Sequence, residues 1–166
     1  MRSKLLIAAG AAGLAVTGVA VTAGVATAGH TNSVLEASLD GRSEVATDAK
    51  DRRNVGDPNG SGEAYVFGID GDPTTLCYVL TVEGIDTARA AHIHEGAAGE
   101  NGPVVANLAA PADGNAADCL TEGEAGKFPT GETVAEILAN PQNYYVNVHN
   151  EQYPGGAIRG QLQPQD

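Results

Sequence analysis

The sequence predicts an all-β protein, an antiparallel β-sandwich or barrel with one short helix. About seven short segments alternate apolar and polar residues, which is the two-residue period of a strand with one buried face. Stretches rich in Gly, Pro, Asn and Asp separate these segments at intervals of about 8 to 12 residues. A single stretch has helical periodicity. This distribution favours sequential hairpins over an α/β fold.

The N-terminal 28 residues have the pattern of a secretory signal peptide. Arg2 and Lys4 precede an apolar, uncharged run over residues 5–25, and an A-x-A cleavage site follows it. The run is also long enough for an uncleaved membrane anchor. Its many Ala, Gly and Thr residues make it only weakly hydrophobic, which favours cleavage. We therefore predict a signal peptide over residues 1–28, one domain over residues 29–166, and a product that is secreted, extracellular or held in the cell envelope.

The charge balance is strongly acidic. The chain has 9 basic and 21 acidic residues, for a net charge of −12. Loss of Arg2 and Lys4 with the signal leaves 7 basic residues against 21 acidic ones, a net charge of −14. Phosphate backbones and anionic lipid surfaces repel such a domain. We expect no nucleic-acid partner and no membrane partner after signal cleavage, which leaves an extracellular protein or a cell-wall component.

Two cysteines, Cys77 and Cys119, remain in the mature chain. An even count in an exported protein predicts one disulfide. The bridge would close a loop of about 40 residues and stabilise the fold by about 3 to 4 kcal/mol in the loop-entropy model. No catalytic role is assigned to it.

The first half of the domain reads as one strand, a long loop and a hairpin. Residues 33–40 place Leu, Ala and Leu on one face and acidic or hydroxyl residues on the other, which predicts the first strand. Residues 41–62 are polar and rich in turn formers, so they predict a loop. Residues 63–69 and 75–82 predict a hairpin around a Gly-Asp-Pro turn at residues 71–73.

The second half begins with strands over residues 90–94 and 104–108, followed by a polar, flexible segment over residues 111–127. The helical signal covers residues 131–139, where Val, Ile and Leu fall at i, i+3 and i+4. An Asn-Pro pair at residues 140 and 141 ends this helix.

The last predicted hairpin joins residues 143–149 to residues 157–162. Its turn is Tyr-Pro-Gly-Gly at residues 153–156, in which Gly155 and Gly156 supply the tight bend.

Two segments carry three of the four histidines. The first, AHIHEGAAGENGPVV, places His92 and His94 on one strand face and Ile93 on the other. In the second, YYVNVHNEQYPGGAIRGQL, Asn147 and His149 alternate with apolar residues. If Ile93 points into a core, all three imidazoles lie on a common outer wall of the barrel.

The joint occurrence of HIH, NGPVV, YVNVH and YPGGAIRGQL resembles the CHRD domain family, a module repeated in chordin and found singly in exported microbial proteins. The resemblance covers essentially the whole mature chain. It implies an immunoglobulin-like β-barrel with a remote likeness to copper-zinc superoxide dismutase. The family has no settled activity, so the resemblance implies no specific reaction.

The dismutase likeness implies candidate copper ligands. In that enzyme an H-x-H pair and two further histidines, one of them on a later strand, hold copper. His92 and His94 match the pair, His149 matches the later ligand, and Arg159 could stand at the substrate-guiding arginine. The sequence departs from the pattern elsewhere: His30 lies near the N-terminus, no histidine remains for the bridging position, and a histidine-rich zinc loop is absent from the sequence.

Three neutral imidazoles from two strands could bind Cu(II) or Zn(II). Alternatively, they are half-exposed surface residues or hydrogen-bond the Gly-rich loop and Asn147. Asn147, Arg159 and Glu95 are possible site-lining residues. Arg159 could instead pair with a carboxylate such as Glu95 or Glu151.

The sequence offers weaker signals for an anion site and for a calcium site. Gly96, Gly99 and Gly102 could cradle an anion on backbone N–H groups, but tight turns are favoured because the loop has no basic residue. The run over residues 57–63, DPNGSGE, spaces oxygen ligands as calcium loops do, yet it lacks the full twelve-residue pattern, so a plain turn is favoured. Calcium is therefore less favoured than copper or zinc.

These observations lead to two function hypotheses. The first is an exported, non-catalytic binding or structural module. The second is a copper-binding redox protein, dismutase-like or for copper storage, that uses His92, His94 and His149. Neither a Ser-His-Asp order nor paired catalytic carboxylates stand out in the sequence.

Overall fold

The computed structural model describes residues 34–46 and 55–165. The predicted signal peptide over residues 1–28 and His30 lie outside the described residues. In the part that is described, no helix is long and apolar enough to cross a membrane.

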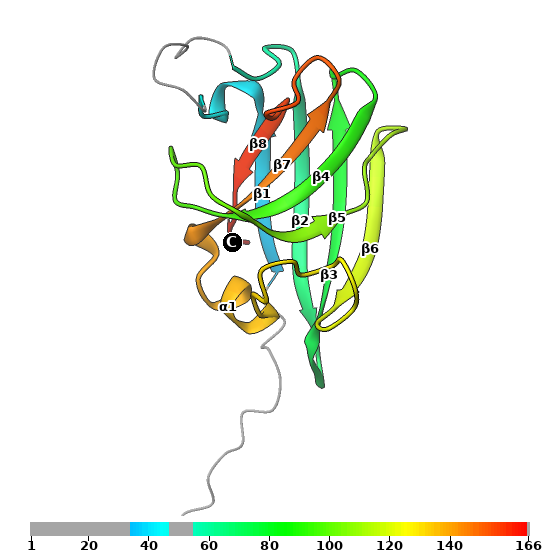
Figure 1. Cartoon of the computed structure of the whole chain (residues 1–166), viewed down its shortest axis with the longest axis vertical. Helices are drawn as coiled ribbons and strands as arrows, with labels where there is room; N and C mark the ends of the chain where they lie inside the picture. The colour runs from blue at the N-terminus through cyan, green and yellow to red at the C-terminus, as the bar shows by residue number, and fades with distance from the viewer. Residues whose placement is uncertain (1–33, 47–54, 166) are drawn as a thin grey trace, which may run out of the picture.

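The described chain forms one antiparallel sheet that curls into a nearly closed barrel, with β4, β5, β7 and β8 lying across β1, β2 and β3 (Figure 1). The sheet order is β5-β4-β7-β8-β1-β2-β3-β6, and β9 pairs with β1. The predicted all-β, antiparallel architecture is confirmed. The strands are β1 (Val34–Asp40), β2 (Ser61–Ile69), β3 (Asp72–Glu83), β4 (Ala88–Glu95), β5 (Val104–Leu108), β6 (Asn115–Thr121), β7 (Tyr144–Asn150), β8 (Ile158–Gln161) and β9 (Gln163–Pro164).

The core follows the predicted alternation. In β1, Leu35, Ala37 and Leu39 are at most 2% exposed, and the residues between them are not buried. In β4 and β7, Ile93 and Val146 are fully buried. Because the period of a strand is two residues, these inward positions fix the outward face of each strand.

The predicted helix is present but shorter than expected. It is α1 (Val134–Ala139), and it begins after a capping box in which Thr133 and Glu136 satisfy each other's backbone N–H groups. Gly131 has a φ of +77° and lies before the helix. Val134, Ile137 and Leu138 are buried, and α1 packs against β2 and β3. The helix therefore covers one end of the barrel (Figure 1).

The predictions for two segments are wrong. The segment predicted as a flexible loop over residues 111–127 contains strand β6, which pairs with β3 along its whole length. The sequence did not indicate this strand, because it lies at the edge of the sheet and buries only Leu120, so apolar and polar residues do not alternate along it. The turn of the first hairpin falls at Asp70 and Gly71, where Gly71 has a φ of +81°. Pro73 accordingly belongs to β3 rather than to the turn.

The predicted disulfide is confirmed. Cys77 and Cys119 are direct partners in the β3–β6 register, and their sulfur atoms are 1.98 Å apart. The bridge therefore fastens the edge strand to its neighbour.

The described part of the predicted 41–62 loop is held to the barrel by hydrogen bonds. The 3-10 helix η1 (Gly41–Ser43) follows β1 and is capped by Asp40. The side chain of Asp57 accepts a hydrogen bond from the Asn59 N–H at 3.0 Å, and the Asp57 N–H donates to the Ala157 carbonyl at 2.8 Å. This is a turn, and residues 57–63 gather no group of metal ligands.

Candidate metal centre

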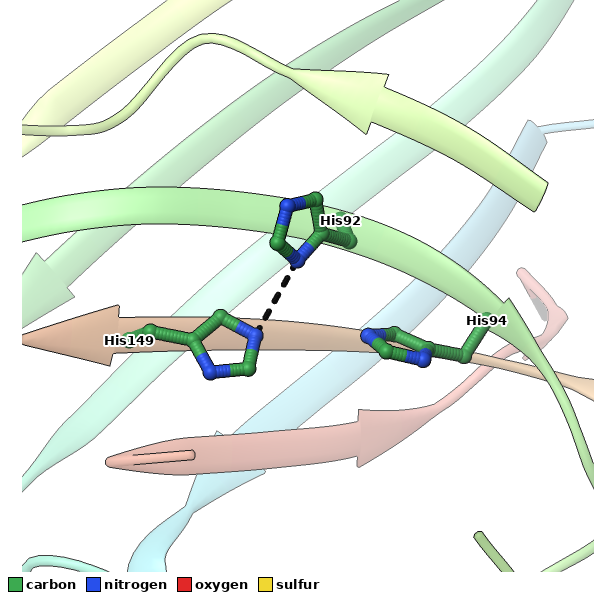
Figure 2. Close-up of side chains that lie close together, drawn as sticks. All are labelled: His92, His94 and His149. Carbon is green, nitrogen blue, oxygen red and sulfur yellow. Dashed lines mark hydrogen bonds between the residues drawn. The ribbon is translucent and has the colours of Figure 1, made fainter. Parts of the chain in front are cut away.

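Strands β4 and β7 place the predicted imidazoles on one outer surface. The two strands are antiparallel neighbours, with Ala90 opposite His149 and His92 opposite Asn147. His92 and His149 are therefore diagonal neighbours on adjacent strands. His94 lies at the next outward-facing position of β4, two residues after His92. The three side chains come together, as Figure 2 shows.

The ligand nitrogens of the three rings converge. His92 Nδ1 and His149 Nε2 are 3.1 Å apart, and one ligand nitrogen from each of the three rings lies within 4.8 Å of the others. In Figure 2 the ring of His94 is directed at His149 with a nitrogen leading. The residues that are described contain no other such group of three metal-binding side chains.

Two backbone carbonyls fix the tautomers of two of the rings. His94 Nδ1 lies 3.0 Å from the Gly102 carbonyl oxygen, and His149 Nδ1 lies 3.2 Å from the Pro154 carbonyl oxygen. A carbonyl oxygen only accepts hydrogen bonds, so Nδ1 carries the proton in both neutral rings. Each Nε2 then presents its lone pair, and His92 Nδ1 donates to that of His149. His94 Nε2 is buried and has no hydrogen-bond partner.

Burial keeps all three rings neutral at physiological pH. It lowers the pKa of His92 to about 4, with a further contribution from the positive charges that His149 and His94 could carry. Burial also lowers the pKa of His94 and of His149, and the carbonyl hydrogen bonds oppose this shift. A neutral imidazole is the form that binds a metal ion.

Tyr145 separates His94 from the expected guiding arginine. The Tyr145 ring is 2% exposed and stacks on His94, with 4.8 Å between centroids and 8° between planes. The guanidinium carbon of Arg159 lies 3.3 Å from the centroid of the same ring. Because β7 lies between β4 and β8 in the sheet, the two neighbours occupy opposite faces of the phenol ring. Arg159 therefore does not reach the histidines.

The expected carboxylate partners of Arg159 are wrong. Glu151 pairs with Arg89 at 3.6 Å on the surface, and Glu95 is an exposed residue at the end of β4. The guanidinium donates instead to Asn101 Oδ1 at 3.3 Å and to the Ala97 carbonyl at 3.1 Å. Both acceptors belong to the loop between β4 and β5.

Glu44 is a half-buried acid that the sequence analysis did not identify. Burial raises its pKa to about 7, while the charge of Arg159 and a hydrogen bond from Asn147 oppose the shift. Asn147 Nδ2 donates to Glu44 Oε2 at 3.4 Å. Glu44 Oε1 and Asn147 Oδ1 are both buried without a hydrogen-bond partner. Asn147 therefore lies between His92, its neighbour on β4, and the carboxyl group of Glu44.

The predicted loop glycines have backbone roles. Gly102 is packed so closely that a Cβ atom there would lie 1.7 Å from the Glu95 carbonyl oxygen, and Gly96 donates its N–H to the Asn143 carbonyl. Gly99 has a φ of +85°. In the last hairpin the positive φ, +142°, falls at Gly156 rather than at Gly155.

The three histidines match the donor set of a Cu(II) or Zn(II) site. Metal–nitrogen bonds of about 2.0 to 2.1 Å at tetrahedral angles place two ligand nitrogens about 3.3 Å apart. The 3.1 Å separation of His92 Nδ1 and His149 Nε2 is close to that value. The buried, unpartnered Nε2 of His94 is a third candidate donor, and an ion held by three protein ligands would keep one coordination position open.

The chain matches a known protein family. The model of the CHRD domain matches residues 35–162, which is more than half of the chain and includes every residue of the histidine group. A search of curated proteins found no match.

Proposed function

Given that the chain belongs to the CHRD domain family, we propose that it is a transition-metal-binding module that holds Cu(II) or Zn(II) between His92, His94 and His149. One observation carries this proposal: three neutral imidazoles converge, and two of them are oriented by backbone carbonyls. Such second-sphere hydrogen bonds fix the tautomer and orientation of metal-binding histidines.

The tautomers define a ligand set. His94 and His149 would coordinate a metal ion through Nε2, because their Nδ1 atoms donate to Gly102 and Pro154. His92 would coordinate through Nδ1, the atom that points into the group, and would then carry its proton on Nε2. Because the His92 ring is already neutral, this change of tautomer releases little net proton at pH 7.

Copper is the favoured metal on affinity. A site of nitrogen donors binds Cu(II) more tightly than Zn(II) in the usual order of divalent ions. A bound ion would act as a Lewis acid at the open fourth position. The proposal assigns metal binding and no catalytic step.

The disulfide supports a site of action outside the cytosol. Bridges of this kind persist in oxidising compartments, and Cys77–Cys119 joins an edge strand whose only buried residue is Leu120. We therefore propose an exported protein. An extracellular protein or cell-wall component as its partner belongs to the same proposal.

Metal titration of matched variants tests the site. Every protein would carry His30→Ala, so that the three clustered rings are the only histidines. We expect the parent to bind one Cu(II) per chain, seen as a visible absorption band and as a higher unfolding temperature. His92→Ala combined with His149→Ala should weaken binding by at least about 100-fold, because it removes two of three ligands. Gln152→Ala, an exposed change near His149, should bind like the parent.

The result that overturns the proposal is equally direct. If the double variant and the parent bind Cu(II) and Zn(II) with the same affinity, the histidine group is not a metal site. Circular dichroism of each metal-free protein establishes that the comparison is made between folded chains.

A further inference from the structure

A pocket lies on the same outer surface as the histidine group, on the far side of Tyr145 from the histidines. It has a volume of about 300 Å³, in the range of sites for small molecules. Two of the residues around it are arginines, although the protein as a whole is strongly acidic. The pocket is lined by Arg42, Ser43, Ala98, Gly99, Arg159 and Gln161.

Arg159 is the buried charge of this pocket. Its side chain is among the largest that are fully buried, and the residue is 2% exposed. Among the described residues, its Nη1 donates to Asn101 Oδ1 and its Nη2 donates to the Ala97 carbonyl oxygen. These bonds use two of the five guanidinium N–H donors. Neither acceptor is charged. The charges of Glu44 and Arg159 influence each other, but the two groups form no ion pair, so an anion in the pocket would give the guanidinium a direct charged partner.

The nearest acids do not supply that anion. Asp40 turns its carboxylate toward η1, where Oδ1 accepts the Arg42 and Ser43 N–H groups at 2.7 and 2.8 Å. Glu44 faces Asn147 and the Gly156 backbone, and it forms no ion pair with Arg159. Arg159 is therefore free to bind a ligand carboxylate in the two-pronged geometry that suits its planar fork.

Gln161 adds a neutral acceptor to the pocket wall. Its Nε2 atom donates to the carbonyls of Gly96, Gln142 and Tyr144 at 2.8 to 3.0 Å, which fixes the orientation of the amide. The other end, Oε1, is buried and has no hydrogen-bond partner. A ligand hydroxyl group would donate the hydrogen bond that this acceptor lacks.

We propose that the pocket binds a small hydroxycarboxylate, with its carboxylate on Arg159 and its hydroxyl group on Gln161. Arg42 at the exposed rim contributes a second positive charge. This site is independent of the metal centre, because the Tyr145 ring stands between Arg159 and the histidines.

Titration with malate and succinate tests the proposal, since the two differ by one hydroxyl group. The readout is the shift of backbone amide NMR signals. Malate should shift the signals of Ser43 and Gly99, and succinate should bind about tenfold more weakly, because it leaves Gln161 Oε1 unpaired. Equal affinity for the two acids would overturn the hydroxycarboxylate assignment. No shift of these signals at millimolar malate would overturn the pocket itself.

Charge variants on the surface provide the matched control. Arg42→Gln should weaken malate binding about fivefold, as expected for one charge at an exposed rim. Arg89→Gln removes another exposed arginine, which lies outside the pocket, and should leave binding unchanged. Equal losses in the two variants would mean that malate senses only net charge, which overturns the proposal. Arg42 is not part of the core, so this comparison does not depend on the folding of an Arg159 variant.

A further arm separates this site from the metal centre. Malate chelates metal ions, so the titration is repeated with the His92→Ala, His149→Ala double variant. Unchanged binding supports an independent pocket. Loss of malate binding in that variant would show that a metal ion mediates it and would overturn the proposal, whatever the result for metal binding itself.

Discussion

The two outer surfaces of the barrel have opposite characters, although both are built by strand alternation. The disulfide face consists of outward residues of β2, β3 and β6, and Val79 at its centre is 42% exposed. The histidine face consists of outward residues of β4, β7 and β8, and Tyr145, Asn147 and Arg159 at its centre are 2 to 3% exposed. An apolar residue is exposed on one face, and polar residues are buried on the other. The disulfide face comprises Tyr65, Phe67, Cys77, Val79, Ala117 and Cys119, and the histidine face comprises His92, His94, Tyr145, Asn147, His149 and Arg159.

The loops account for the difference. The segment between β4 and β5 folds over the histidine face and supplies carbonyl oxygens to His94 and Arg159, from Gly102 and Ala97. The disulfide face has a covalent link instead, through Cys77 and Cys119. Burial of polar groups is costly unless they are hydrogen-bonded. His94 Nε2, which is buried without a partner, lies on the histidine face and is one of the atoms to which we assign ligand binding.

Removal of the disulfide should have the largest effect on stability and none on the metal site. Cys77→Ala combined with Cys119→Ala frees a loop with a sequence separation of 42 residues. The free energy of unfolding should fall by about 4 kcal/mol. Urea denaturation measures this loss, and Cu(II) affinity at low temperature should be unchanged. A large loss of metal affinity in the folded variant would show that the two faces are coupled.

The next largest effect is a pH dependence from Glu44. Its pKa is raised from the ordinary 4.5 to about 7, so between these values the folded state holds a proton that the unfolded state has lost. This contribution to stability is complete below pH 4.5 and is lost as the pH rises through 7. In Glu44→Gln the side chain at this position is uncharged at every pH of the experiment. The stability of the variant relative to the parent should therefore rise by up to about 3 kcal/mol between pH 4.5 and pH 7.5.

The comparison with the parent isolates Glu44 from the histidines. The pKa of His92 is lowered from 6.5 to about 4, so its contribution to stability is lost as the pH falls below 6.5. The two effects oppose each other in the parent, but the histidines are common to both proteins and cancel in the difference. A difference that does not change with pH would show that Glu44 titrates normally.

A third, more local effect should follow from Gly102→Ala. A Cβ atom at this position would collide with the Glu95 carbonyl and displace the carbonyl that orients His94. Loss of a second-sphere partner reduces metal affinity by about 10- to 100-fold. Gly99→Ala is the control in the same loop: it strains a positive φ, but nothing lies within 4 Å of the added Cβ. Equal Cu(II) affinities in the two variants would contradict the role of the Gly102 carbonyl.

Strand alternation was sufficient to predict the all-β fold and the common face of His92 and His94. It works because Ile93 and Val146 are strongly apolar and fix which side is inward. It failed for β6, where a single buried leucine gives no pattern. The disulfide followed from the even cysteine count rather than from periodicity.

The surroundings of the histidines could not be predicted in the same way. Glu44 and Gln161 come from segments distant in sequence from His92, and their contacts depend on how loops close over the sheet. Tyr145 was predictable as a strand residue, but its position between His94 and Arg159 depends on the order of β4, β7 and β8. Sequence periodicity indicates which residues share a face. It does not indicate which loop covers them.

The smallest expected effect tests whether the disulfide face is uncovered in solution. Val79→Thr exchanges a methyl group for a hydroxyl group at a position that is 42% exposed. Water can bind that hydroxyl group, so the free energy of unfolding should change by less than about 0.5 kcal/mol. The matched change Val148→Thr places the hydroxyl group in the core, where the valine is fully buried, and should cost about 1 to 3 kcal/mol. Urea denaturation at two protein concentrations distinguishes the cases. A concentration-dependent loss above 1 kcal/mol for Val79→Thr would show that another chain covers this face.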